Sequence, residues 1–436
     1  MSRNDATEIF LAGVKAVKPD NFIPAYIKID NEYLDIGSSK IPLGALSNIY
    51  VAAAGKAAAA MALETEQILG DYITEGLIIT KYEHALPSKK CKTIEAGHPV
   101  PDNNSITGGN ELLTLFKKAG KNDLIIMLVS GGASALVTDC PPGISLGDIQ
   151  QTVQLLLSCG ASIDEINTIR KHLSLLKGGQ LVKYTDANII SLILSDVPGD
   201  DLSVIASGLT VADNSSFEDA WKIIVKYKLS DALPPGICKW LLHGVEKRIP
   251  DTPKPGDEIF KKVNNIIVAN NDIALQASAQ KAKQLGYAVQ ILPEQLSGEA
   301  AEKAVSFLEI LNKVGAPKKT CLLWGGETTV TIKSKGKGGR NQEFALAALC
   351  TAEKDNKTGL KKITILSGGT DGTDGPTDAA GAVIDERSLL QTTLNPCDYL
   401  ANNDAYHFFK QAGGLLITGP TQTNVMDIVI GLINPA

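Results

Sequence analysis

Residues 49–57 read Ile-Tyr-Val-Ala-Ala-Ala-Gly-Lys-Ala, an apolar run that ends in a glycine and a lysine. Such a run without polar alternation is typical of a parallel strand that is buried on both faces of a sheet. The stretch that follows, residues 56–69, is rich in alanine, methionine and leucine and predicts a helix. A buried strand followed at once by a helix is the repeating unit of an α/β sheet.

The same pattern recurs along the first half of the chain. Further apolar runs lie at residues 76–80, 124–129 and 189–194, and residues 146–157 predict another helix. This alternation predicts an α/β fold whose N-terminal part is a Rossmann-like, doubly wound sheet.

A second set of elements follows a candidate domain boundary. Residues 249–257 contain three prolines and a glycine, which disfavour regular structure. We therefore expect an N-terminal α/β domain over residues 1–250 and a C-terminal mixed α/β region over residues 258–436. Strands are predicted in this second region at residues 265–269, 287–292, 320–324, 363–366, 381–384, 415–418 and 428–432.

The composition excludes several classes of protein. The 436 residues are 44% apolar, which excludes a disordered chain, and the net charge of −6 argues against a nucleic-acid-binding surface. No apolar stretch approaches the ~20 residues of a membrane span, and the acidic start lacks the apolar core of a signal peptide. Seven scattered cysteines without a CxxC pair predict reduced thiols rather than a disulfide framework or a zinc site. We expect a soluble cytoplasmic protein.

Glycine-rich and charged residues follow five of the predicted strands, where ligands bind in open α/β sheets. After residue 129 come Ser130, Gly131, Gly132 and Ser134, which predict a turn whose backbone can approach an anion. Lys56 follows the first strand and could contact a phosphate. Each feature also has a structural interpretation when taken alone. The glycine-rich segment could be a tight strand–helix turn, and Lys56 could be a solvated surface lysine. The turn is not a Walker A loop.

A basic loop precedes a predicted helix in the second region. Residues 335–343 hold three cations and three glycines, a composition that suits a polyphosphate, although an exposed turn would look similar. Arg340 ends the loop and could stabilise a transferring phosphoryl group. The remaining candidate binding residues from this region are Gly338, Gly339, Asn341, Glu327, Thr421 and Asn424.

Carboxylates among glycines suggest a magnesium site. Asp196 and Asp371 are the candidate ligands, since Mg²⁺ uses one or two carboxylates together with substrate phosphates. Turn formation and helix capping are the alternative roles for such aspartates. Arg170 and Lys171, on a predicted helix, could hold a carboxylate.

The motifs together resemble one family. They are AAGKA at 53–57, VSGGASAL at 129–136, NTIRKHLSLLKGG at 167–179, LSDVPGDD at 194–201, GGETTVTIK at 325–333, GKGGRNQEFALA at 336–347, SGGTDGTDGPTDAAGAV at 367–383 and GPTQTNVMD at 419–427. The chain resembles the two-domain glycerate kinases with a C-terminal MOFRL domain, here at about residues 318–430, which are sometimes labelled hydroxypyruvate reductases. The resemblance implies ATP and D-glycerate as substrates, 2-phosphoglycerate as product, a divalent cation such as Mg²⁺, and an active site in the cleft between the domains.

The resemblance also assigns roles. It implies that Lys56 and Arg340 are the catalytic pair that stabilises the transferring phosphoryl group. We add Asp196 as the group that orients or deprotonates the attacking hydroxyl. Leu209 and Gln422 replace a proline and a glycine that are usual in the family, which changes local loop shape and removes no charged group.

Two other functions compete with the kinase. A hydroxypyruvate reductase using NAD(P)H would need a Gly-x-Gly-x-x-Gly turn after a strand, and the sequence has none at the required spacing. A non-catalytic nucleotide or sugar-acid sensor would bind without turnover. The sequence leaves open the loop that binds ATP, the carbon that is phosphorylated, the enantiomer, the metal and the oligomeric state, for which a homodimer is one option.

Overall fold

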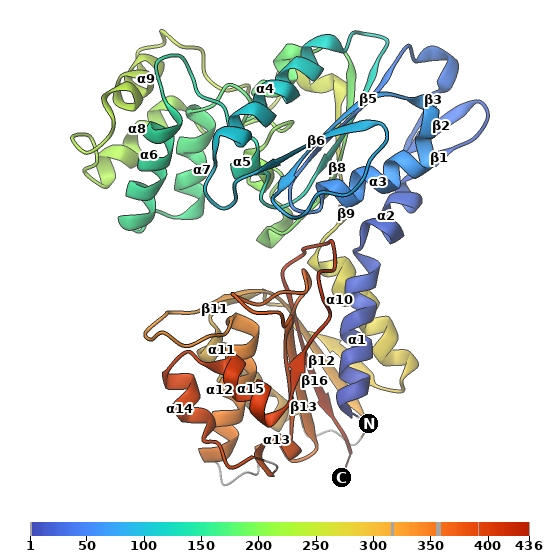
Figure 1. The fold of residues 1–436 in the computed structure, drawn as a ribbon, viewed down its shortest axis with the longest axis vertical. Helices are drawn as coiled ribbons and strands as arrows, with labels where there is room; N and C mark the ends of the chain where they lie inside the picture. The colour runs from blue at the N-terminus through green and yellow to red at the C-terminus, as the bar shows by residue number, and fades with distance from the viewer. Residues whose placement is uncertain (1, 315–317, 355–358, 391, 436) are drawn as a thin grey trace. The chain divides into compact units, whose positions relative to one another are not determined.

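The computed structural model describes residues 2–314, 318–354, 359–390 and 392–435. The chain forms two compact units (Figure 1). The N-terminal unit comprises residues 22–268, and the C-terminal unit comprises residues 1–21 together with residues 269–436. Each unit is an α/β structure around its own sheet, so the predicted two-domain α/β fold is confirmed.

The N-terminal unit contains a six-stranded sheet. Its strands are β4 (Ile49–Ala54), β5 (Ile73–Lys81), β6 (Cys91–Ala96), β7 (Leu124–Val129), β8 (Asn188–Leu194) and β9 (Val263–Ala269). They lie in the order β6-β5-β4-β7-β8-β9, and the pairs from β6 to β8 are parallel. When the strands are numbered within the sheet, this order is 3-2-1-4-5-6, the strand order of the Rossmann fold. The order in which successive strands are added to the sheet reverses between β4 and β7.

Helices cover both faces of this sheet. Every residue of β4 and β7 is buried, as the unbroken apolar runs predicted. Helix α4 (Asn103–Lys118) buries Leu112 and Phe116 in the cluster that contains alternate residues of β4, while α3 (Ala58–Leu69) also contacts β4. Strands β1 (Ile27–Ile29), β2 (Tyr33–Ile36) and β3 (Ser39–Pro42) form a small antiparallel sheet, and α2 (Pro19–Tyr26) spans the division between units.

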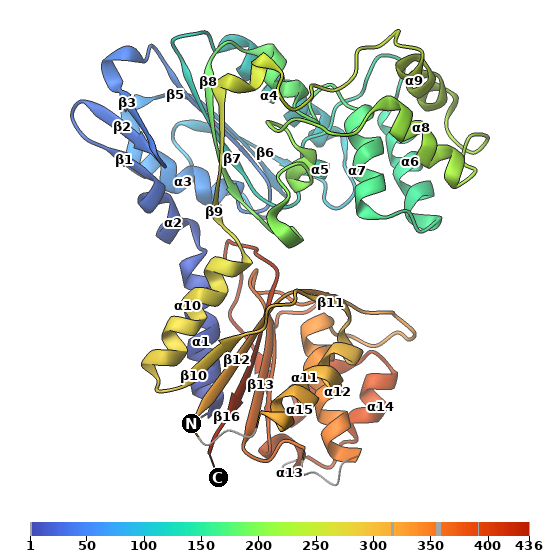
Figure 2. The ribbon, with the colours of Figure 1, turned by 180° about the vertical axis from the view of Figure 1, so that it is seen from behind.

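A helical cluster completes the N-terminal unit. It consists of α6 (Leu146–Ser158), α7 (Ile163–His172), α8 (Phe217–Lys226) and α9 (Pro235–Val245), which share one hydrophobic core and lie to one side of the sheet in Figures 1 and 2. Serine residues at 145, 162 and 216 form capping boxes that fix where α6, α7 and α8 begin. The short helix α5 (Ala133–Leu136) joins β7 to this cluster.

The C-terminal unit has a mixed sheet in the order β10-β12-β16-β13-β14-β15, with β11 also paired to β12. The strands are β10 (Ala288–Ile291), β11 (Leu296–Glu299), β12 (Thr320–Thr329), β13 (Ile363–Gly369), β14 (Gly381–Asp385), β15 (Leu415–Leu416) and β16 (Asp427–Ile433). Helices α1 (Ser2–Ala16) and α10 (Asn271–Gln284) lie on one face, and α11 (Ala300–Lys313) and α12 (Arg340–Lys354) lie on the other (Figures 1 and 2). The shorter helices are α13 (Arg387–Leu390), α14 (Pro396–Ala401) and α15 (Ala405–Ala412).

The division between the units differs from the predicted boundary at residues 249–257. That proline-rich segment belongs to the N-terminal unit, where the Asp251 carboxylate lies 3.0 Å from His172 Nε2 and Thr252 Oγ1 donates to Asp213. The first helix belongs to the C-terminal unit because it packs against α10. The prolines and the glycine of residues 249–257 therefore indicate a loop within the N-terminal unit and not a boundary between domains.

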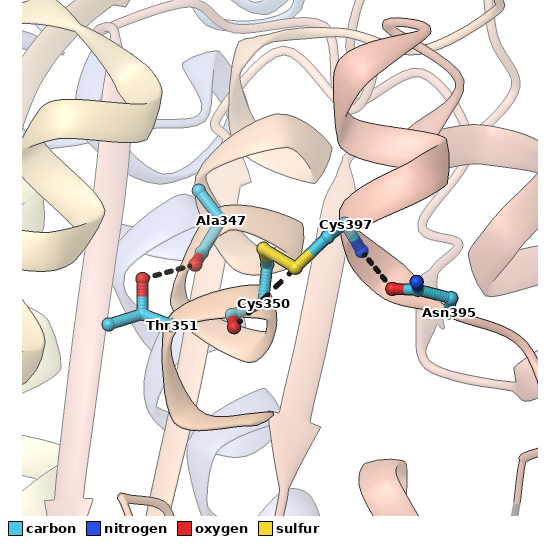
Figure 3. Close-up of a disulfide and its surroundings, with 5 residues drawn as sticks. All are labelled: Ala347, Cys350, Thr351, Asn395 and Cys397. Carbon is cyan, nitrogen blue, oxygen red and sulfur yellow. Dashed lines mark hydrogen bonds between the residues drawn. A yellow bond between two sulfur atoms is a disulfide. The ribbon is translucent and has the colours of Figure 1, made fainter. Parts of the chain in front are cut away.

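Cys350 of α12 and Cys397 of α14 form a disulfide, with their Cα atoms 5.0 Å apart (Figure 3). The prediction that all cysteines are reduced is therefore wrong for this pair, because helix packing joins residues whose spacing in the sequence carries no signal. Cys91, Cys140, Cys159, Cys238 and Cys321 are free thiols. Within the described ranges, no helix has the length and apolar character needed to cross a bilayer.

Candidate active site

Two turns meet where the strand order of the N-terminal sheet reverses. Gly55 follows β4 with φ of +130°, and a Cβ there would lie 2.2 Å from Ser130 Oγ, so the position needs glycine. The backbone N–H of Lys56 donates to the Gly131 carbonyl at 2.9 Å, and that of Ala57 donates to Ser130 Oγ at 3.0 Å. The structure thus brings together the lysine and the glycine turn that the sequence predicted.

Three polar side chains surround the glycines of this turn. A Cβ on Gly131 would lie 1.7 Å from Asp196 Oδ2, and a Cβ on Gly132 would lie 3.0 Å from His98 Cδ2 and 3.2 Å from Lys56 Cγ. We call Lys56, His98, Gly131, Gly132 and Asp196 the lysine cradle. It lies at the carboxyl ends of β4, β6, β7 and β8, the edge at which Rossmann folds bind ligands.

Burial and nearby charges shift the pKa values of two groups of the lysine cradle. Burial lowers the pKa of His98 to about 4, assisted by the positive charges of Lys56, Lys81 and His84, so His98 is neutral at pH 7. Burial raises the pKa of Asp196, which the charge of Lys56 opposes. Concentrated positive charge at a strand edge suits an anionic ligand.

His98 was not among the site residues predicted from the sequence. The signal that would have found it is its position in the loop that follows β6, a strand of the same parallel sheet. Carboxyl ends of neighbouring parallel strands meet at one edge, so this loop had to lie near Lys56.

Of the other predicted residues of the N-terminal unit, Ser134 and Arg170 line one cavity and Lys171 does not. Ser134 Oγ lies 2.9 Å from Ser207 Oγ, and Arg170 lines a cavity of 610 Å³. Lys171 instead forms a buried ion pair with Asp213 at 3.2 Å. The neighbouring residues Arg170 and Lys171 therefore do not form one anion site.

Arg340 begins α12 of the C-terminal unit and is held by two carboxylates. Its Nε and Nη2 donate to Asp427 Oδ2 and Oδ1 at 2.6 and 3.0 Å, and its Nη1 lies 2.6 Å from Glu327 Oε1. Asp427 is fully buried at the start of β16, paired in register with Gly326 of β12 and Gly369 of β13. We call Arg340, Asp427 and Glu327 the arginine cluster.

Asp427 was missed among the predicted site residues. The sequence feature that could have identified Asp427 is its position at the start of a buried strand, because a buried carboxylate needs a partner of opposite charge. Burial raises the pKa of Asp427 in spite of the opposing charge of Arg340. Burial alone would lower the pKa of Arg340, and the charges of Asp427 and Glu327 reverse that effect and raise it.

Asp374 anchors the basic loop to the start of α12. Its two carboxylate oxygens accept from the backbone N–H groups of Asn341 and Gln342 at 3.0 and 2.8 Å, and burial raises its pKa to about 6. A Cβ on Gly339 would lie 2.4 Å from Asp374, and the Gly338 carbonyl leaves equally little room beside Gly375. The glycines therefore allow two loops to pack together.

Three further predicted residues contact the protein itself. The buried Asn341 donates to Asp427 Oδ1 at 2.9 Å and accepts from Ser367 Oγ at 2.6 Å. Thr421 Oγ1 donates to the Thr370 carbonyl, and Asn424 Oδ1 accepts from the Met426 N–H. These contacts fix the loops around the arginine cluster, and a role for the three residues in ligand binding stays a prediction.

The two predicted metal ligands lie in different units. Asp196 belongs to the lysine cradle, and Asp371 Oδ1 accepts from the Thr373 N–H at 3.0 Å. Within the part of the chain that the structure describes, no group of three or more histidine, cysteine or acidic side chains is placed to hold a metal ion. A metal carried by substrate phosphates needs fewer protein ligands than that.

Comparison with known proteins agrees with the motifs. Residues 320–427 match the MOFRL family, and residues 5–242 match the family described as "Domain of unknown function (DUF4147)". The chain is 39% identical to the glycerate 2-kinase of Pyrococcus horikoshii, over 96% of this chain and 94% of that protein. It belongs to the glycerate kinase family that carries a MOFRL domain.

A second relative and a solved structure support this membership. The chain is 38% identical to the D-glycerate 2-kinase of Thermotoga maritima, over 98% of this chain and 97% of that protein. The crystal structure of a glycerate kinase from Thermotoga maritima superposes with a TM-score of 0.85 at 36% identity and covers 99% of both chains. The predicted family and the predicted enzyme class, a phosphotransferase of the glycerate kinase family, are confirmed.

Proposed function

We propose that this glycerate kinase transfers the γ-phosphoryl group of ATP to D-glycerate and forms 2-phosphoglycerate and ADP. The observation that carries the proposal is the lysine cradle at the point where a Rossmann sheet reverses its strand order. The names of the relatives from Pyrococcus horikoshii and Thermotoga maritima support the substrate and the carbon that is phosphorylated.

In this mechanism the oxygen of the glycerate hydroxyl forms a bond to the γ-phosphorus while the bond from that phosphorus to the β,γ-bridging oxygen breaks. ADP leaves with the electron pair of the broken bond, and the hydroxyl proton passes to Asp196. Such a transfer needs alignment and positive charge more than covalent help from the protein. We assign the stabilisation of the transferring phosphoryl group to Lys56 and Arg340.

The surroundings of these groups suit the assigned roles. Gly131 and Gly132 present no side chain, so the Asp196 carboxylate and the His98 ring can lie against the backbone beside Lys56. Asp427 holds Arg340 by two hydrogen bonds and fixes the plane of its guanidinium. Because burial raises the pKa of Asp196, its carboxylate is a better proton acceptor than an exposed aspartate.

Magnesium would enter with the nucleotide and neutralise phosphate charge, which is how this ion serves most kinases. Asp196 and Asp371 stay our candidate ligands for it. Asp196 fits because its carboxylate lies against the glycine turn of the cradle.

The test is ADP release from Mg-ATP with D-glycerate by the wild type and by Lys56→Ala and Arg340→Ala, with the product carbon identified by ³¹P NMR. We expect wild-type turnover and losses of about 10³-fold or more in both variants, provided that their circular dichroism matches the wild type. No ADP release from the wild type would refute the kinase. Oxidation of NADH with hydroxypyruvate would favour the reductase instead.

A further inference from the structure

The proposed mechanism does not use a 610 Å³ cavity of the N-terminal unit, whose lining lies within residues 99–177. Its walls come from the loop after β6, from α6 and from α7. They are mainly apolar and include Val100, Ile149, Val153, Leu157, Ile169 and Leu173. Val100 is 60% exposed and Leu157 is 56% exposed, so large apolar side chains at this cavity contact solvent. A ligand that covered them would remove apolar surface from water.

Two cations lie among these apolar walls. The ammonium group of Lys177 is almost fully buried, where its Nζ donates to the Val137 carbonyl at 2.7 Å, and burial lowers its pKa to about 8. Arg170 stands on the last turn of α7, and among the described residues its guanidinium has no hydrogen-bond or ion-pair partner. Asp139 is the one acidic residue of the lining. A partly buried, unpaired guanidinium has hydrogen-bond donors to offer a ligand.

Residues of the cavity lining are close in the chain to residues of the lysine cradle. Pro99 of the lining follows His98 in the chain, and Ser134 of the lining comes two residues after Gly132. A Cβ built on Gly132 would lie 3.0 Å from His98 Cδ2, so the two residues are neighbours in the cradle. A ligand with a phosphate in the cradle could therefore extend its other end into the cavity.

We propose that this cavity holds the nucleoside of ATP, with the triphosphate directed toward the lysine cradle, a placement that rests on the proposed kinase function. A cavity of 610 Å³ is in the range of sites that enclose a whole organic ligand, and apolar walls suit the faces of a purine ring. The ring nitrogens of a purine accept hydrogen bonds, which Arg170 and Lys177 can donate. Glycerate, a three-carbon hydroxy acid, has neither the size nor the apolar surface for these walls. The N-terminal unit is thereby assigned to the nucleotide.

A substitution that fills the cavity tests this placement. Val153 lies on α6, lines the cavity and is half-buried, so Val153→Trp should occupy the space without disturbing the core. Val225 of α8 is 54% exposed and lies outside the lining, which makes Val225→Trp the matched control. Binding of adenosine and of ADP is measured by calorimetry, and the KM values for ATP and D-glycerate are measured by ADP release.

For Val153→Trp we expect adenosine and ADP to bind at least about tenfold more weakly, with the KM for ATP raised and that for D-glycerate changed by less than about twofold. Val225→Trp should match the wild type. Arg170→Met, which keeps the cavity open, should also weaken both ligands and serves as the second test if Val153→Trp fails to fold.

Wild-type affinity for adenosine and ADP in a folded Val153→Trp would overturn the proposal, as would an effect on D-glycerate alone or the absence of nucleotide binding by the wild type. Failure of the kinase function gives a different result. In that case the wild type binds ADP, Val153→Trp does not, and neither releases ADP from ATP with D-glycerate, which leaves the nucleoside site standing.

Discussion

Replacing Asp427 by asparagine should show how much each of the two carboxylates that hold Arg340 contributes to stability and activity. The substitution keeps the size of the side chain and removes its charge, so the guanidinium loses a bidentate partner that is fully buried. The new amide also turns an N–H group toward donors of Arg340 or Asn341, because Asp427 Oδ1 accepts from both. Glu327→Gln is the matched control, since its side chain is 44% exposed.

The magnitudes follow from burial. Breaking a buried ion pair by removing one partner costs about 3–5 kcal/mol, and because the Arg340 side chain is 31% exposed we expect about 2–3 kcal/mol for Asp427→Asn. An exposed pair contributes about 0.2–1 kcal/mol, which is the loss expected for Glu327→Gln. The catalytic effect should be larger, because a guanidinium displaced by about 1 Å can cost about 10²-fold in kcat.

Thermal unfolding measures the loss of stability, and steady-state ADP release measures the catalytic effect. We expect the midpoint temperature of the C-terminal unit to fall by about 5–10 °C in Asp427→Asn and by no more than about 3 °C in Glu327→Gln. If Glu327→Gln destabilises the unit as much as Asp427→Asn does, the argument from burial is wrong. If Asp427→Asn retains wild-type kcat, Asp427 does not position Arg340 for the reaction.

Three further predictions concern single positions. Reducing the Cys350–Cys397 disulfide, which closes a loop of 47 residues, should lower the free energy of unfolding by about 2–4 kcal/mol, and a double serine variant should reproduce this loss without added reductant. Gly131→Ala places a Cβ 1.7 Å from Asp196 Oδ2, so kcat should fall by about 10²-fold, and unchanged kinetics would contradict the packing described here. With the pKa of His98 lowered to about 4, the unfolded chain binds more protons between pH 4 and 6.5, so stability should fall as the pH drops through that window. His98→Gln should remove about 1–2 kcal/mol of this fall, allowing for partial exposure, and identical pH profiles of unfolding would refute it.

The α/β sheets and all of the lysine cradle except His98 could be predicted from the sequence, because they depend on local signals. The sequences of buried parallel strands such as β4 and β7 are unbroken apolar runs, and glycines occur in the turns that follow them. Once parallel strands are identified, their carboxyl ends must meet at one edge, which brings Lys56 and Gly131 together.

The features that sequence reasoning missed depend on packing between distant segments. The partner of Arg340 is Asp427, 87 residues away, and no local pattern joins them. Cys350 and Cys397 approach each other only because α12 and α14 pack side by side. For the same reason the proline-rich segment at 249–257 was read as a boundary, although long-range hydrogen bonds from Asp251 and Thr252 tie it into one unit.

Helix α1 has a consequence for the order of events during synthesis. It buries Ile9, Phe10 and Val14 in a unit whose remaining residues begin at 269. At about 5–20 residues per second, roughly 10–30 s pass between the synthesis of residue 268 and the completion of the sheet that covers these side chains. The N-terminal unit is continuous in sequence and can fold during this interval. The apolar face of α1 stays exposed to solvent until the C-terminal sheet is complete. A chaperone that binds short apolar helices would find a target in α1 during this interval.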